Sequence, residues 1–327
     1  MKRRTFITLL GSAAVACCPV VARTQSRVRR IGVVIGDTET GPIAAALPAF
    51  RQEMQKLGWI DRSNVHISYH YVAPDPKVIK TVAAELAALA PDLIVSNTNL
   101  VTEILHSEIR STPIVFVGVS DPIGSGFVTD LSRPTGNLTG FANFELSMGG
   151  KWLEKLREVA PRVERIGFIL HPETPPNIGF LKSAEDAAAT LNMKVIALGV
   201  HSGVEIEHAL AAFSTEPRGG LIIAPHAVTF ANSDLIVALA ARYRLPAIYP
   251  LAFYAKAGGL ISYGNDLSDQ FRQAAVYVDR ILRGTQLNAL PVQLPTKFEF
   301  VLNLKTAQTL GLEVPLFVQQ LADEVIE

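Results

Sequence analysis

Short apolar runs alternate with longer amphipathic segments from about residue 30 onward. The runs at 31–35, 65–71, 93–95 and 114–117 are rich in β-branched residues and are bounded by Gly, Pro, Asp or Asn, a pattern that predicts strands. The segments between them, 43–57, 76–89 and 99–109, have helical length and helical apolar spacing. Because strand and helix alternate, we expect a parallel sheet covered by helices on both faces.

The same alternation begins again in the second half of the chain. A Gly-rich segment at 136–140, interpreted as a crossing, precedes a predicted helix over 148–159. Strands are predicted at 166–170, 194–198, 221–224 and 247–249, with helices between them, and two further strand-like runs, 260–263 and 298–303, flank a long predicted helix over 266–283. The sequence therefore predicts an α/β protein of two lobes, with more than one crossing of the chain between them.

The first two dozen residues have the pattern of an export signal. Lys2, Arg3 and Arg4 precede an apolar stretch over 6–16, and small or apolar residues suited to signal-peptidase cleavage follow at 19–22. The Arg3-Arg4 pair before Thr-Phe-Ile resembles a twin-arginine signal, and an ordinary secretory signal is the alternative. We expect residues 1–26 to be removed and the protein to be periplasmic, with a lipid anchor at Cys17 as a further alternative.

Charge and motifs exclude several classes of function. Basic and acidic residues number 30 each, without a long like-charge run after the leader, so nucleic acid is not an expected partner. Neither a nucleophile elbow nor a Walker loop is present, and no Gly-x-Gly-x-x-Gly follows the first predicted strand. The histidines are interpreted as scattered, and the two cysteines are adjacent. We therefore expect no catalytic residues, no metal site and no cofactor.

Candidate ligand contacts come from the carboxyl ends of the predicted strands, where open parallel sheets bind ligands. In the second half these ends include the segments His171-Pro-Glu-Thr and Pro225-His226. The candidate contacts are Asp37, Asn97, Thr98, Asn99, Ser120, Asp121, Phe141, Glu173, Thr174, His226, Tyr249, Tyr263 and Asp266. Most of these residue types also favour turns and helix caps, so a purely structural role is the alternative for each.

The candidate contacts match the chemistry of a zwitterion. Thr98 and Asn99 begin a predicted helix, whose unpaired N–H groups and positive dipole end favour an anion such as a carboxylate. Asp37 or Asp121 could face an ammonium group, and aromatic residues such as Tyr249 could stack on an apolar or aromatic ligand side chain. An amino acid or a related small carboxylate is therefore the predicted ligand.

Several stretches, taken in order along the chain, resemble one family. They are the start Met1–Ile7, Leu57-Gly58-Trp59, and the segments 112–122, 131–140, 244–249, 257–264, 275–284, 295–299, 303–307 and 322–327. Together they are similar to the ABC-transporter substrate-binding proteins of the family that includes tryptophan and other amino-acid binders. The chain departs from the family's usual pattern at His171-Pro172 and Pro225-His226, where Asn-Pro and Asp-Pro are usual.

The resemblance implies a periplasmic binding protein of type I, with two Rossmann-like lobes, parallel sheets and a multi-segment hinge. We expect lobe I to comprise residues 27–143 with about 266–295, and lobe II to comprise 144–265 with about 296–327. The resemblance also implies a membrane permease of an ABC transporter as the partner, and we expect the protein to be a monomer.

These observations together favour a binding module over an enzyme. The expected function is that of the periplasmic solute-binding component of an ABC importer, which closes around its ligand by a hinge motion. One alternative is a sensor of the same fold that signals to a membrane receptor. The other is an exported α/β hydrolase that uses Asp37 or Asp121 together with a histidine as acid and base.

Overall fold

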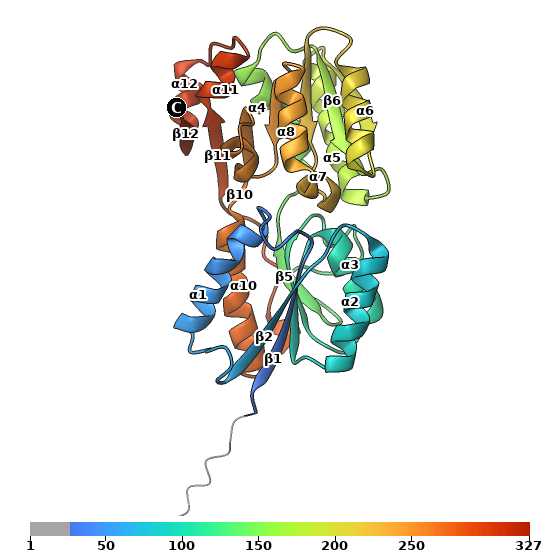
Figure 1. Cartoon of the computed structure of the whole chain (residues 1–327), viewed down its shortest axis with the longest axis vertical. Helices are drawn as coiled ribbons and strands as arrows, with labels where there is room; N and C mark the ends of the chain where they lie inside the picture. The colour runs from blue at the N-terminus through green and yellow to red at the C-terminus, as the bar shows by residue number, and fades with distance from the viewer. Residues whose placement is uncertain (1–26) are drawn as a thin grey trace, which may run out of the picture.

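The computed structural model describes residues 27–327, which form two α/β lobes stacked along the long axis of the molecule (Figure 1). The expected export signal, its Arg3-Arg4 pair and Cys17 lie outside the described residues. Within 27–327, none of the helices combines the length and the apolar character that a membrane crossing requires. Two lobes with largely parallel sheets confirm the predicted fold class.

The first lobe contains a five-stranded parallel sheet in the order β2-β1-β3-β4-β5. Its strands are β1 (Arg29–Ile35), β2 (Val65–Tyr71), β3 (Leu93–Asn97), β4 (Ile114–Val119) and β5 (Leu138–Ala142). Its helices are η1 (Ala44–Ala46), α1 (Leu47–Lys56), α2 (Pro76–Leu89), α3 (Asn99–Glu108), α10 (Leu267–Leu282) and η2 (Leu287–Ala289). Helices α1 and α10 cover one face of the sheet and α2 and α3 cover the other (Figure 1), so the strands are apolar on both faces.

The second lobe contains a seven-stranded sheet in the order β12-β11-β10-β9-β8-β6-β7. Its strands are β6 (Arg165–Leu170), β7 (Lys194–Gly199), β8 (Gly219–Ile223), β9 (Ala247–Tyr249), β10 (Ile261–Asn265), β11 (Phe298–Asn303) and β12 (Glu324–Ile326). Its helices are α4 (Met148–Val159), α5 (Pro175–Thr190), α6 (Gly203–Phe213), α7 (Ala227–Ala231), α8 (Ser233–Arg242), α9 (Ala252–Lys256), α11 (Leu304–Thr309) and α12 (Leu316–Leu321). All neighbouring strands are parallel except β10 and β11.

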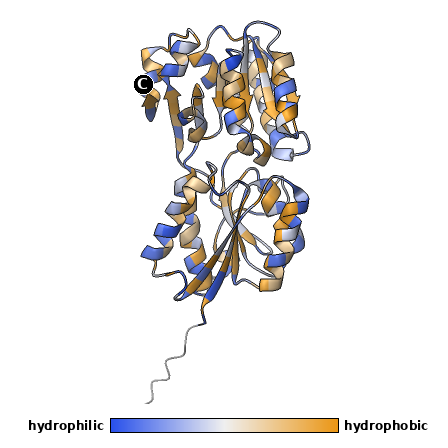
Figure 2. Cartoon of the chain, viewed as in Figure 1, coloured by the Kyte–Doolittle hydropathy of each residue, from blue (hydrophilic) through white to orange (hydrophobic). Residues whose placement is uncertain are grey.

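Capping side chains explain where several helices begin. The Asp75 carboxylate accepts the backbone N–H of Lys77 at the start of α2, and Ser202 caps α6 in the same way. Asp266 caps α10, which is strongly amphipathic and buries one face against the first sheet. Figure 2 shows the result, with apolar residues concentrated along the strands and the inner faces of the helices.

The chain passes between the two sheets three times. It leaves the first lobe after β5, returns through the link from β10 to α10, and leaves again through residues 290–297 to enter β11. Each crossing is short, and the three lie together where the lobes meet (Figure 1). Such a bundle of short links allows the lobes to rotate relative to one another as rigid bodies.

The Gly-rich segment 136–140, expected to be a crossing, instead leads into the edge strand β5, which pairs with β4. A Cβ atom added at Gly140 would lie 2.0 Å from the carbonyl oxygen of Phe116, so glycine is needed for the close approach of these strands. The crossing itself begins only after Ala142. The glycines therefore mark backbone proximity and not a linker.

Candidate ligand cavity between the lobes

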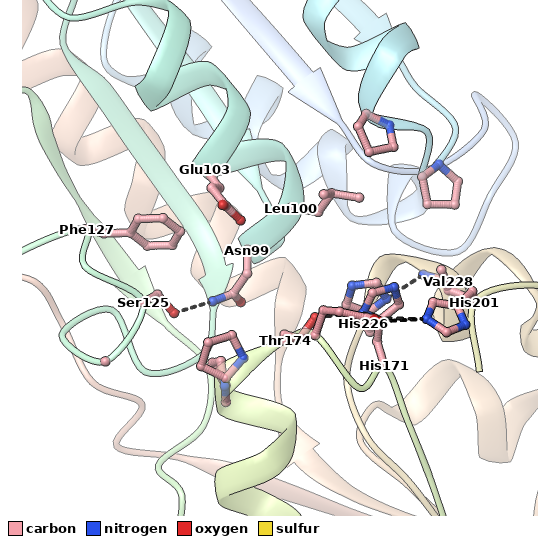
Figure 3. A pocket seen from close by; sticks show the side chains of 16 residues that line it. Asn99, Leu100, Glu103, Ser125, Phe127, His171, Thr174, His201, His226 and Val228 are labelled. Carbon is pink, nitrogen blue, oxygen red and sulfur yellow. Dashed lines mark hydrogen bonds and ion pairs between the residues drawn. The ribbon is translucent and has the colours of Figure 1, made fainter. Parts of the chain in front are cut away.

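A cavity of about 550 Å³ lies between the two lobes and is lined by both of them. The first lobe contributes Pro74, Pro76, Asn99, Leu100, Glu103, Gly124, Ser125 and Phe127, and the second contributes His171, Glu173, Thr174, Pro175, Pro176, His201, His226 and Val228. Figure 3 shows Asn99, Ser125 and Phe127 on one side and the three histidines gathered on the other. This volume lies within the range of small-molecule sites.

The first-lobe wall is built at the start of α3. Thr98 precedes this helix in a left-handed conformation (φ 61°), and its hydroxyl accepts the backbone N–H of Val101. The Asn99 amide donates to the carbonyl oxygen of Ser120 and to Oγ of Ser125, and its Oδ1 accepts the backbone N–H of Ser120. Asn99 therefore lines the cavity while its polar atoms hold the loop after β4 in place.

The second-lobe wall is formed by histidines from three neighbouring strands. His171 follows β6, His201 lies two residues after β7, and His226 follows β8, so their side chains meet at the carboxyl edge of the sheet. The rings of His171 and His226 are stacked, with centroids 4.2 Å apart. The His201 ring stands edge-on to His171, with centroids 5.1 Å apart. The expectation that the histidines are scattered is therefore wrong for these three.

Two carboxylates flank the His201 ring. Its Nε2 lies 3.0 Å from both carboxylate oxygens of Glu173, and its Nδ1 lies 2.9 Å from Oε2 of Glu205. Hydrogen bonds to these carboxylates raise the pKa of His201, and the same bonds lower the pKa of Glu173 and of Glu205. Glu173 also lies 3.3 Å from Nδ1 of His171, whose pKa is lowered by burial.

His226 is the most enclosed of the three histidines, with 6% of its surface exposed. The backbone N–H of Val228 donates to its Nδ1 at 3.1 Å, which places the proton of the neutral ring on Nε2. Burial lowers the pKa of His226 to about 3, so the ring is uncharged near neutral pH. His226 therefore offers a neutral N–H donor at the cavity wall.

Four of the predicted contacts, Asn99, Glu173, Thr174 and His226, line this cavity. Asn97 and Thr98 line a far smaller void nearer the hinge. Phe141 and Asp266 line a separate cavity of about 330 Å³ beside the crossings, which also contains Arg272 and Lys297.

The other predicted contacts do not line the cavity between the lobes, because their side chains are used within the fold. The Asp37 carboxylate accepts backbone N–H groups of Thr38, Ile43 and Ala44, and burial raises its pKa. Ser120 donates to Oδ1 of Asn143, and Asp121 accepts the backbone N–H of Gly124.

The two predicted tyrosine contacts pack inside the second lobe. The Tyr249 ring is fully buried and stacks on Tyr254 at 4.8 Å, and Tyr263 stacks on Phe298. Tyr263 is half-buried, and neither tyrosine lines the cavity between the lobes, so stacking on a ligand stays a prediction for both.

Several lining residues were not among the predicted contacts, including His171, His201 and Glu103. The strand-end rule that selected His226 applies equally to His171, and almost equally to His201. The apolar part of the lining, Leu100, Phe127 and Val228, has no comparable signal in the sequence because these residues are typical of any core.

Two lobes, three crossings and a cavity lined from both sides define the class of bilobal binding proteins. Residues 39–326 match the family described as "ABC transporter substrate binding protein", and the chain belongs to this family. This family is one of substrate-binding proteins, which confirms the expected class of a binding protein over an enzyme.

Individual relatives are distant in sequence. The chain is 22% identical over 274 residues to a tyrosine-binding protein of Clostridioides difficile, covering 82% of this chain and 77% of that protein. A conserved domain protein of Vibrio cholerae has a TM-score of 0.85, with 22% identity and coverage of 91% of this chain and 100% of that one. An ABC domain of Streptococcus pneumoniae in complex with L-Trp has a TM-score of 0.84, with 22% identity and coverage of 91% and 99%.

Proposed function

We propose that this protein is the periplasmic solute-binding component of an ABC importer and that it closes on an amino acid or a related small carboxylate. The observation that carries the proposal is the cavity of about 550 Å³ between the lobes, lined from both sides. A ligand that contacts both lobes gains its full set of contacts only when they close, and so it shifts the population toward the closed state. Closure then changes the surface offered to a permease.

The lining has groups for both parts of such a ligand. Helix α3 directs its N-terminal end at the cavity through Asn99 and Leu100, and the neutral Nε2–H of His226 is a further donor, so a carboxylate has partners on both walls. Glu103 and Glu173 can pair with an ammonium group, and Phe127 and Leu100 offer apolar surface. Tyrosine and L-Trp are named for two of the relatives, which supports an amino acid here.

The leader supports the periplasmic location. Arg3 and Arg4 ahead of an apolar stretch fit an export signal, as the transport role requires. A protein that presents its closed surface to a permease acts as a single bilobal unit, and we propose that it is a monomer.

A thermal-shift screen tests the proposal. The mature protein is unfolded and refolded to remove carried ligand and is then heated with amino acids, aromatic acids and small carboxylates in turn. A ligand at one hundred times its Kd should stabilise the native state by about 2.7 kcal/mol, which corresponds to a rise of roughly 5–10 °C for a lobe of this size. Absence of any rise across the panel would refute the proposed ligand class.

A matched pair of variants locates the binding site. His226→Asn keeps a side-chain oxygen to accept the backbone N–H of Val228 but removes the imidazole from the cavity wall. His208→Asn makes the same change at an exposed position of α6. We expect only the His226 variant to lose the ligand-induced rise, and equal rises in both variants would place the ligand elsewhere.

A further inference from the structure

We propose that His171, Glu173 and His201 form a binding site for a divalent transition-metal ion such as Zn²⁺, and that the solute completes its coordination from the cavity. The second half of this statement rests on the proposed solute-binding function, whereas the metal site stands on its own geometry. All three residues line the wall of the cavity on the second lobe.

The distances suit a common metal ion. One ligand atom from each of the three side chains lies within 4.8 Å of the others. Nε2 of His201 lies 3.0 Å from the Glu173 carboxylate, and Nδ1 of His171 lies 3.3 Å from it. Ligand atoms around a tetrahedral Zn²⁺, with bonds of about 2.0–2.1 Å, are separated by roughly 3.3 Å. The separation between His171 and Glu173 already has this value, that between His201 and Glu173 is about 0.3 Å shorter, and the two histidine nitrogens lie within 4.8 Å of each other.

A second carboxylate orients His201 as metal-binding histidines are usually oriented. The Nδ1 of His201 faces Glu205 at 2.9 Å, and Glu205 is itself held by the backbone N–H of His201 and by the Ser202 hydroxyl. A carboxylate on one ring nitrogen directs the other nitrogen toward the metal and increases its basicity. Here that other nitrogen, Nε2, faces Glu173. The His171 ring is positioned in turn by its stacking on the buried His226 ring.

The proposed metal site is accessible from solvent and faces the cavity. The side chains of His201 and Glu173 are 48% and 66% exposed, so an ion can enter from solvent. Two histidines and one glutamate supply three protein ligands and leave a fourth position for water or for another molecule, as in catalytic zinc sites. Imidazole ligands favour Zn²⁺, Cu²⁺ or Ni²⁺ over Mg²⁺ and Ca²⁺. A carboxylate in the cavity can take the fourth position, and Glu103 on the opposite wall, in place of the metal-bound Glu173, then remains to pair with an ammonium group.

Titration calorimetry with ZnCl₂ tests the metal site directly. Tag-free mature protein, treated with EDTA and dialysed, should bind one Zn²⁺ per chain and show no comparable response to MgCl₂. His201→Ala and Glu173→Gln each remove a ligand and should weaken binding by more than tenfold. Glu205→Gln removes only the orienting carboxylate and should weaken binding about 10–100-fold. His208→Ala, at an exposed position on the same helix as Glu205, should leave binding unchanged.

Circular dichroism and the melting midpoint confirm that each variant is folded, which the exposed positions of His201, Glu173 and Glu205 favour. Wild-type protein without saturable Zn²⁺ binding, or binding that His201→Ala leaves intact, would overturn the metal site.

Repeating the thermal-shift screen with Zn²⁺ and with EDTA separates the two proposals. A solute that raises the midpoint further when Zn²⁺ is present supports coordination of the solute by the metal. Equal shifts in both buffers refute that coordination but leave the solute-binding function intact. If no solute acts in either buffer while calorimetry shows Zn²⁺ binding, the metal site stands and the proposed solute class fails.

Discussion

A close contact between helices α4 and α5 in the second lobe leads to a sharp prediction for two adjacent glycines of α4. A Cβ atom added at Gly149 would lie 1.9 Å from the backbone carbonyl oxygen of Phe180 in α5 and 2.7 Å from the carbonyl carbon. A Cβ atom at Gly150 would lie 3.3 Å from the carbonyl oxygen of Ser183, a tight but tolerable contact. Gly149→Ala must therefore push the two helices apart, whereas Gly150→Ala needs a shift of only a few tenths of an ångström.

The expected change in the free energy of unfolding follows from two opposing effects. Alanine gains up to about 1 kcal/mol over glycine in a helix interior, and overpacking typically costs 1–3 kcal/mol and occasionally more. The atoms that the added Cβ would meet belong to the backbone of Phe180, which cannot move aside as a side chain can. We therefore take the upper end of the overpacking cost and expect Gly149→Ala to lower the free energy of unfolding by about 2–3 kcal/mol. For Gly150→Ala the two terms nearly cancel. These values correspond to a midpoint roughly 5–10 °C lower for Gly149→Ala and to little change for Gly150→Ala.

Thermal denaturation of the two variants beside the wild type checks this prediction. Helix α5 begins directly after Glu173 and Thr174, so the displacement in Gly149→Ala should also weaken any ligand-induced rise in the midpoint. The reasoning is wrong if Gly149→Ala melts within about 2 °C of Gly150→Ala.

Three further changes probe the first lobe. The Tyr69 hydroxyl is buried without a hydrogen-bond partner among the described residues, so Tyr69→Phe should leave stability equal or slightly higher at neutral pH. Burial raises the pKa of Tyr69 from 10.0 to about 12. Between pH 10 and pH 12 the folded state therefore keeps a proton that the unfolded state has lost, so the free energy of unfolding falls as the pH rises through this range. Urea denaturation at pH 9 and pH 11 should show a smaller fall in the variant. Asn137→Ala removes the amide that donates to the carbonyl oxygens of Ile109 and Thr112. The free energy of unfolding should fall by about 2–4 kcal/mol in the same assay, and a fall below about 1 kcal/mol would contradict this account. Trp59→Phe removes the indole N–H bond to Asp279 and should cost about 1 kcal/mol, and a change in the ligand-induced rise would contradict its purely structural role.

The parallel sheets could be predicted well because their strands carry a strong local signal. Strand β2 and helix α2 have the predicted bounds, since apolar or aromatic residues alternate with polar ones along β2 and a Pro marks the helix start. The short edge strand β12 was not predicted, because its three residues form a strand only through pairing with β11. Strand β5 was mistaken for a crossing because glycine marks both a flexible link and a close backbone approach.

The location of the candidate site could be predicted from the sequence, but the full set of residues that line it could not. The rule that ligands bind at strand ends led to Glu173, Thr174 and His226, which line the cavity. The rule cannot tell which strand-end residues turn inward, and Asp37 serves instead to tie its own loop together. The meeting of His171 with His201 depends on the order of β6, β7 and β8 in the sheet, and periodicity in the sequence does not contain that order.

The three crossings between the lobes also determine the order in which the protein can be completed during its synthesis. Helix α10 covers one face of the first sheet, yet it ends about 140 residues after the last strand of that sheet, a delay of roughly ten to thirty seconds at common rates of translation. The second sheet receives β11 and β12 later still. Until these segments follow, the first lobe therefore has part of one apolar face uncovered and the second has an unpaired strand edge at β10, both of them surfaces prone to aggregation.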